Sequence, residues 1–218
     1  DKKTAGREAI TARMVADILS TGGADRILTI DLHSAQIQGF FNIPVDHLTA
    51  VKLLSSRIKT GNLEDAVIVS PDAGRVGMAS EYANLLGLPV VVIHKRRIDP
   101  ERTVVAHVVG DVKEKRPIII DDMIATGGTV ARSVEALLQS GAQPDMQVVA
   151  THGILVGNAL ENLSAPAIKR IIVTNSVPLG SDKRMDKMEI VSIAGLLAEA
   201  ISRIHDDRSV SELFTLVA

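Results

Sequence analysis

Residues 121–129, DDMIATGGT, combine two adjacent carboxylates with a run of small and hydroxyl-bearing residues. Gly127 and Gly128 allow the backbone to bend so that successive N–H groups point inward, and the threonines on either side add hydroxyl donors. A buried strand is expected before this segment and a helix after it, and the positive end of the helix dipole favours an anion. The pattern predicts a phosphate cradle made of Ala125, Thr126, Gly127, Gly128 and Thr129.

The two carboxylates of Asp121 and Asp122 would repel a phosphate group, but they are good acceptors for the vicinal hydroxyls of a sugar. Phosphate and diol together indicate a pentose phosphate. The segment lacks the lysine of GxxxxGK[ST], which disfavours a P-loop ATPase. The simpler alternative is a β-turn in which an aspartate caps the following helix.

Three other segments place polar residues directly after expected strands: DLHSAQ at 31–36, SPDAGR at 70–75 and HKRR at 94–97. Ligands of open α/β sheets bind beyond the carboxyl ends of strands, so these segments are candidates for one site. A neutral His33 imidazole can bind a metal or a phosphate, although a lone histidine is more often structural. Gly74 offers an anion-binding turn, or else a plain turn capped by Asp72. By composition alone, HKRR is a solvated charge run.

The elements that must position these residues alternate along the chain. Apolar β-branched runs predict strands, and apolar residues at helical spacing predict helices. Strands are expected at 26–30, 66–70, 90–94, 117–121, 148–153 and 170–175, and helices around 10–19, 51–58, 76–86 and 129–140. This alternation predicts an α/β fold with a mostly parallel sheet.

The composition excludes several classes of protein. The 218 residues are 46% hydrophobic and 23% charged, with a net charge of -2, so disorder and a general basic field for nucleic acid or acidic membranes are disfavoured. Three Phe and one Tyr are too few for base-stacking platforms. Without cysteine there are no disulfides or thiolate ligands, and no apolar run approaches the length of a membrane span. We expect a cytoplasmic protein with no nucleic-acid or membrane partner.

The DDMIATGGT segment resembles the ribose-phosphate-binding loop of phosphoribosyltransferases and of the ribose-phosphate pyrophosphokinases. DLHSAQIQGFFNIPVD at 31–46 separates the two, because it resembles the pyrophosphokinase motif over all its positions and is not shared by the transferases. The resemblance covers essentially the whole chain. It continues, in the order of that family, through VSPDAGR at 69–75, HKRR at 94–97, VGDV at 109–112, VTNSVPL at 173–179 and SVSELF at 209–214.

The resemblance implies an enzyme that transfers pyrophosphate from ATP to ribose 5-phosphate with the help of Mg²⁺. It implies that Lys95 and Arg97 are catalytic, on a flexible loop that closes over ATP. Arg96, between them in an extended segment, is expected to face the other way. Arg97 would also contact ribose 5-phosphate, together with Asp121, Asp122 and the cradle. His33, Asp72 and Gly74 would bind ATP or pyrophosphate, with His33 and Asp72 as the metal ligands.

The same resemblance implies two phosphoribosyltransferase-like (type I) units, the first of them incomplete. Residues 1–47 with 200–218 would be a remnant of the first unit, and 48–199 the second. About a hundred residues of a usual family member would precede residue 1. A homo-oligomer, a hexamer in the family, is the expected assembly.

Two alternatives remain open at this point. A phosphoribosyltransferase acting on a nucleobase would share the cradle, and a noncatalytic synthetase-associated regulatory subunit would fit a short N-terminus. Ala125 also departs from the family, because many members carry Asp there.

Overall fold

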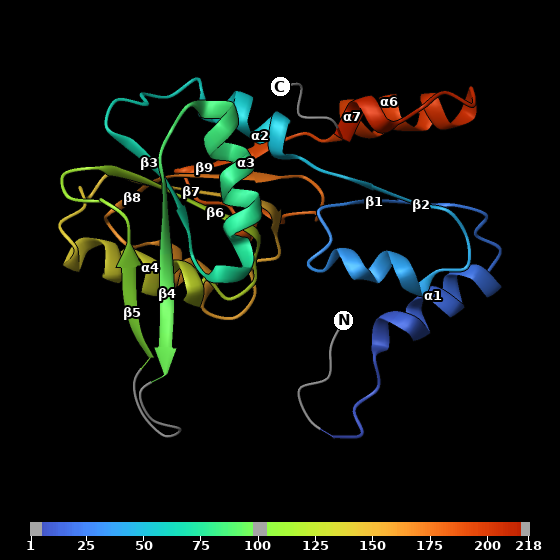
Figure 1. The fold of residues 1–218 in the computed structure, drawn as a ribbon, viewed down its shortest axis with the longest axis horizontal. Helices are drawn as coiled ribbons and strands as arrows, with labels where there is room; N and C mark the ends of the chain where they lie inside the picture. The colour runs from blue at the N-terminus through green and yellow to red at the C-terminus, as the bar shows by residue number, and fades with distance from the viewer. Residues whose placement is uncertain (1–5, 98–103, 215–218) are drawn as a thin grey trace. The chain divides into compact units, whose positions relative to one another are not determined.

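The computed structural model describes residues 6–97 and 104–214 (Figure 1). They divide into two compact units, each with its own sheet. One unit contains the described residues up to Ala50 and those from Ala198 onward, and the other contains Val51–Leu197. Within the described parts of the chain, no helix combines the length and hydrophobicity that crossing a membrane requires.

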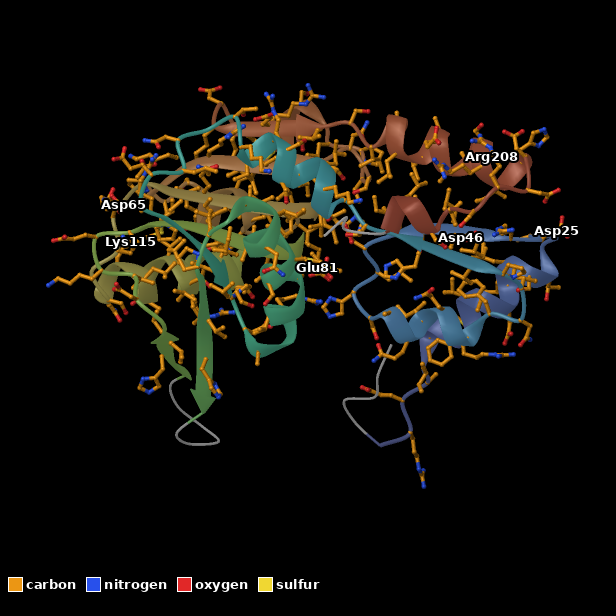
Figure 2. All side chains as sticks on the ribbon, turned by 45° about the horizontal axis from the view of Figure 1, so that its top comes forward. Asp25, Asp46, Asp65, Glu81, Lys115 and Arg208 are labelled. Carbon is orange, nitrogen blue, oxygen red and sulfur yellow. The ribbon has the colours of Figure 1, made fainter. Side chains whose placement is uncertain are left out.

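The first unit is built on a parallel pair of strands, β1 (Ile27–Ile30) and β2 (Val45–Leu48), with Ile27 opposite Val45. Arg26, directly before β1, donates to both carboxylate oxygens of Asp46 in β2, at 2.5 and 3.2 Å (Figure 2 labels Asp46). The unit also contains the helices α1 (Thr11–Thr21), η1 (Ala35–Phe40) and α7 (Ser211–Phe214), and most of α6 (Ala194–His205).

The second unit holds a seven-stranded sheet in the order β5-β4-β3-β6-β7-β8-β9. Every neighbouring pair is parallel except β4 with β5, which confirms the predicted mostly parallel α/β fold. The strands are β3 (Ala66–Ser70), β4 (Val90–Arg97), β5 (Val104–Val109), β6 (Arg116–Ile124), β7 (Met146–Gly153), β8 (Ile168–Thr174) and β9 (Met188–Val191). The helices are α2 (Val51–Ile58), η2 (Ala73–Arg75), α3 (Val76–Leu86), α4 (Gly128–Gln139), α5 (Ala159–Leu163) and η3 (Ser181–Lys183).

The central strands are buried because they carry apolar side chains on both faces, as parallel sheets covered by helices do. All five residues of β3 are buried. Alternate residues of the strands pack with α4 and α5 in one cluster that includes Val69, Ile119, Val148 and Leu137. Outside that cluster, Leu54 of α2 and Tyr82 of α3 are also fully buried. The sheet is thereby fixed as a platform whose carboxyl edge carries the polar turns.

The HKRR segment differs from its expected conformation. β4 continues through Arg97 and pairs antiparallel with β5, with Lys95 opposite Ala106 and Arg97 opposite Val104. The predicted loop position of Lys95 and Arg97 is therefore wrong for their backbone, because pairing with β5 extends the strand through Arg97. β5 is not among the strands predicted from the sequence, and residues 98–103, between β4 and β5, lie outside the described residues.

Candidate functional site

Two adjacent carboxylates lie near the carboxyl end of β6. Asp122 is buried, with 1% of its side chain exposed, whereas Asp121 retains 13%. Asp121 accepts a hydrogen bond from the backbone N–H of Asp122, and Asp122 accepts one from the N–H of Met123, both at 2.9 Å. Successive residues of a strand point to opposite faces, and these backbone bonds hold both carboxylates close to the strand end.

Arg75 provides the positive charge for this pair. Its Nη2 lies 3.0 Å from Asp122 Oδ2, and its Nε lies 3.5 Å from Asp121 Oδ1. Only 16% of the Arg75 side chain is exposed. Arg75 ends η2, the short turn after β3, and β3 is the direct neighbour of β6 in the sheet. Sequence reasoning missed this residue, although its position at the end of SPDAGR was visible.

Burial in this place changes the proton affinity of Asp121. Loss of hydration, followed by the neighbouring Asp122, raises the pKa of Asp121 to about 7, while Arg75 acts in the opposite direction. Both causes of the rise act by disfavouring a second negative charge in a poorly hydrated place. At neutral pH, Asp121 is therefore close to its pKa, so its protonated and ionised forms are both populated.

The predicted phosphate cradle follows directly. Residues 125–127 bend, and α4 begins at Gly128. Gly127 has φ 72°, a left-handed conformation that favours glycine, and a Cβ atom there would lie 3.1 Å from the Cβ of Asn162. Asn162 of α5 also donates to the carbonyl of Thr126 at 2.8 Å. Of the two glycines, Gly127 has a positive φ and Gly128 does not.

The start of α4 has the properties of an anion site. The first N–H groups of a helix have no acceptor within the helix, and the helix dipole adds partial positive charge there. Arg132, one turn along α4, folds back so that its Nη1 would lie 3.3 Å from a Cβ atom at Gly128. Arg132 is exposed and makes no hydrogen bond or ion pair with any described residue. Sequence reasoning missed it, although its spacing of four residues from Gly128 was the available signal.

The SPDAGR turn adopts the capped form that sequence reasoning kept as its alternative. Asp72 Oδ1 accepts the N–H of Gly74 at 2.9 Å, and Ser70 Oγ donates to the Asp72 carbonyl at 2.7 Å. The Gly74 amide that the resemblance assigns to pyrophosphate is thus bonded within its own turn. A role for Gly74 in binding pyrophosphate requires that this hydrogen bond be exchanged, and it stays a prediction.

His33 lies in the first unit, on the turn after β1, and its side chain is exposed. Two hydrogen bonds to backbone N–H groups fix this turn. Asp31, which is buried and has φ 40°, accepts the N–H of Ala50 at 2.9 Å. The N–H of Leu32 donates to His47 Nε2 at 2.8 Å. Burial lowers the pKa of His47, against the influence of Asp31. His47 therefore remains a neutral acceptor at neutral pH.

His33 and Asp72 belong to different units, so their sharing of one metal ion stays a prediction. Among the described residues, no group of three or more His, Asp or Glu side chains is placed to hold a metal ion. Mg²⁺ commonly binds through one or two carboxylates with substrate phosphates and water, which Asp72 fits. The side chains of Lys95 and Arg97 lie outside the described residues.

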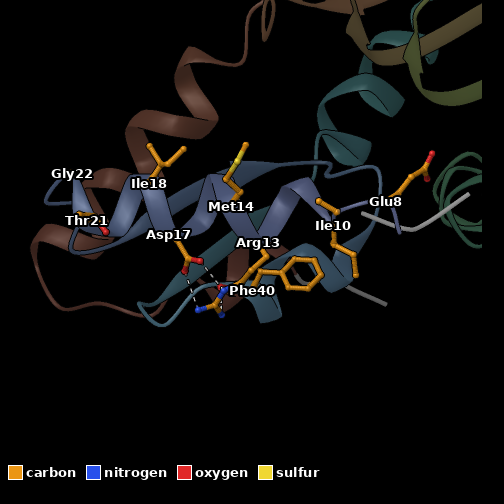
Figure 3. Close-up of a pocket in the computed structure, with 10 residues that line it drawn as sticks. Glu8, Ile10, Arg13, Met14, Asp17, Ile18, Thr21, Gly22 and Phe40 are labelled. Atoms are coloured by element: carbon orange, nitrogen blue, oxygen red, sulfur yellow. Dashed lines mark hydrogen bonds and ion pairs between the residues drawn. The ribbon is translucent and has the colours of Figure 1, made fainter. Parts of the chain in front are cut away.

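An apolar hollow of the first unit is lined by none of the predicted site residues (Figure 3). It runs along α1 beside Phe40, and Arg13 and Asp17 form an ion pair at its rim. Met14 and Ile18 line it and are 55% and 60% exposed. Its lining offers few polar groups to a nucleotide or sugar phosphate.

Comparison with known proteins decides the family. A ribose-phosphate pyrophosphokinase from Clostridium acetobutylicum is 44% identical over 98% of this chain and 67% of its own length. The chain belongs to the ribose-phosphate pyrophosphokinase family. One from Bacillus caldolyticus is 45% identical over 98% of this chain and 68% of its own length. Residues 98–215 match the family model described as phosphoribosyl synthetase-associated domain.

The solved structures agree with this family assignment. The phosphoribosylpyrophosphate synthetase from Mycobacterium smegmatis superposes with a TM-score of 0.87 at 47% identity, over 95% of this chain and 67% of its own. The predicted family and fold class are thereby confirmed. The chain spans about two thirds of the length of the ribose-phosphate pyrophosphokinases that it matches.

Proposed function

We propose that this chain acts as a ribose-phosphate pyrophosphokinase, forming phosphoribosyl pyrophosphate and AMP from ribose 5-phosphate and ATP. One observation carries the proposal: a single strand, β6, carries two carboxylates near its carboxyl end and leads within a few residues into the start of α4. The carboxylates suit the two sugar hydroxyls, and the helix start suits the 5-phosphate. The names of the relatives favour this activity over a phosphoribosyltransferase.

In this proposal the anomeric hydroxyl of ribose 5-phosphate attacks the β-phosphorus of ATP, and AMP leaves in line. Asp121 and Asp122 orient the sugar through its hydroxyls, while residues 125–129 hold the phosphate. Lys95 and Arg97 stabilise the negative charge that gathers on the transferred oxygens, because such transfer is accelerated mainly by positioning and by fixed cations.

Mg²⁺ is the proposed cofactor, with Asp72 and His33 as its ligands from this chain. The ion would neutralise the phosphates of ATP when bound. His33, Asp72 and Gly74 together would bind ATP or pyrophosphate, with Gly74 exchanging its hydrogen bond to Asp72 for one to an oxygen of the ligand. A cytoplasmic location and self-association of the chain complete the proposal.

Two measurements test the proposal. Calorimetry should detect ribose 5-phosphate binding to the chain and much weaker binding of ribose, because the phosphate supplies the charge that the cradle recognises. Incubation with ATP, ribose 5-phosphate and Mg²⁺ should release AMP. Absence of ribose 5-phosphate binding would contradict the ribose site. Release of pyrophosphate only after addition of a nucleobase and phosphoribosyl pyrophosphate would instead indicate a transferase.

A further inference from the structure

Adjacent buried carboxylates need a partner. Asp122 is almost fully buried and Asp121 nearly so. In a poorly hydrated place, two such groups either share a proton, take up a metal ion or face a fixed cation. The structure places the guanidinium of Arg75 against both.

The geometry of Arg75 suits a bridging role. Its Nε and Nη2 approach different carboxylates, so one planar group spans the pair. A lysine ammonium is a point charge and does not reproduce a planar, two-sided contact. Arg75 itself is held at the end of η2, where the backbone is fixed by the capped Asp72 turn.

We propose that Arg75 is the built-in counter-ion of the ribose-hydroxyl acceptors. As a positioning residue, it orients Asp121 and Asp122 and offsets their negative charge, in the place that a divalent cation would otherwise take. Ribose 5-phosphate then binds to this edge of the sheet without needing a metal ion. This inference rests on the proposed function, because it assumes that the sugar hydroxyls meet this carboxylate pair.

The inference also assigns different cations to the two substrates. Divalent metal is needed for the phosphates of ATP, through the turn that carries Asp72, and not for the sugar. Because Arg75 ends the turn that Asp72 begins, the two substrate sites share one short segment. Removing Arg75 should therefore make the sugar site dependent on metal, which a purely structural role would not do.

The experiment is calorimetric titration of the chain with ribose 5-phosphate, in EDTA and in Mg²⁺. Wild type should bind equally, within about twofold, in both buffers. Arg75→Gln should bind about tenfold more weakly in EDTA, since a charged hydrogen-bonding group that orients the acceptors is lost, and Mg²⁺ should recover part of that loss. Arg75→Lys should be intermediate, and Lys59→Gln, an exposed residue after α2, should match wild type.

Circular dichroism confirms that each variant is folded, and Arg75→Lys, which keeps the charge, carries the test if Arg75→Gln does not fold. Wild-type affinity in EDTA for both Arg75 variants would overturn the inference while leaving the proposed function intact. So would a wild-type chain that binds ribose 5-phosphate only with Mg²⁺. A wild-type chain that binds no ribose 5-phosphate in either buffer would overturn the proposed function, and the inference with it.

Discussion

The turn after β1 and the end of β6 place aspartates in similar positions but use them differently. In the turn after β1, Asp31 and His47 accept hydrogen bonds from backbone N–H groups of the protein, at 2.9 and 2.8 Å. At the second, Asp121 and Asp122 face Arg75, beside a helix start. The first arrangement shapes a turn, and the second holds two carboxylates and a guanidinium together next to the predicted phosphate cradle. A polar strand end is therefore informative only when its partners are known.

The β4–β5 hairpin adds a third kind of strand end, one that carries cations, and it offers the largest expected effect. Lys95→Ala and Arg97→Ala should each lower turnover by on the order of 10²–10³, with little change in ribose 5-phosphate affinity, because in the proposed mechanism they meet charge that develops only in the transition state. Steady-state kinetics, measured on a form of the protein that is catalytically active, tests this prediction.

Arg96→Ala is the matched control, since alternation along β4 places position 96 on the opposite face from 95 and 97. Its turnover should stay close to that of wild type. Wild-type turnover in both Lys95→Ala and Arg97→Ala would contradict the catalytic role and favour the alternative that HKRR is a solvated run of charges.

The two aspartates near the end of β6 should contribute unequally to the free energy of unfolding. Asp122→Ala should lower the free energy of unfolding by about 3 kcal/mol, because it leaves Arg75 buried without its closer partner. Asp121→Ala, which removes the longer and more exposed contact, should lower it by about 1 kcal/mol. Urea unfolding measures both, and equal losses would contradict the unequal roles assigned to the two aspartates.

The two regions should respond to pH in opposite directions. The pKa of Asp121 is raised to about 7, so between pH 4 and 7 the folded chain keeps a proton that the unfolded chain loses, and this group's contribution to stability falls as pH rises. The pKa of His47 is lowered, so below pH 6.5 the unfolded chain binds the extra proton, and its contribution rises with pH.

Unfolding of wild type, Asp121→Asn and His47→Gln at pH 5.5 and pH 8 isolates each contribution by difference. Relative to wild type, Asp121→Asn should lose the falling part of the profile and His47→Gln the rising part. If the free energy of unfolding changed equally between pH 5.5 and pH 8 in all three proteins, the opposite pH responses assigned to Asp121 and His47 would be wrong.

The two cradle glycines provide a smaller and sharper contrast. Gly127→Ala should destabilise the chain by about 1–2 kcal/mol, because its φ is 72° and the new Cβ would crowd Asn162. Gly128→Ala should be nearly neutral for stability, since its Cβ would meet only the ends of the Arg132 and Thr126 side chains. Thermal unfolding compares them, and equal shifts of the midpoint would show that the left-handed turn is not required.

The smallest expected effect belongs to Arg132. Arg132→Gln should weaken binding of ribose 5-phosphate by about fivefold, because an exposed cation beside the helix start contributes about 1 kcal/mol to holding a phosphate. Binding of ribose should not change. Calorimetry at low salt measures both, with Lys59→Gln as the control for loss of one exposed charge. An equal loss for ribose would show that Arg132 acts on the fold and not on the phosphate.

Much of this protein is determined by local sequence. The β-branched run AVIVS becomes β3, and TGGTVARSVEALL gives a turn followed by α4, because strand burial, glycine turns and helical spacing are local properties. The alternation of these elements is enough to predict the mostly parallel sheet. The DDMIATGGT and DLHSAQ segments are enough to indicate the family and to mark candidate residues, because both motifs are short and continuous in the chain.

The tertiary structure decided which charges meet. Arg75 and Asp122 are 47 positions apart in the sequence, and they touch only because β3 and β6 are neighbours in the sheet. Strand pairing also extends β4 through HKRR, since the bonds to β5 satisfy backbone groups that the charged sequence gave no reason to place in a strand. Residue types and spacing marked Asp121 and Asp122 as the candidate acceptors for a sugar phosphate. Their counter-ion, burial and proton affinity depend on neighbours that come together only when the sheet is assembled.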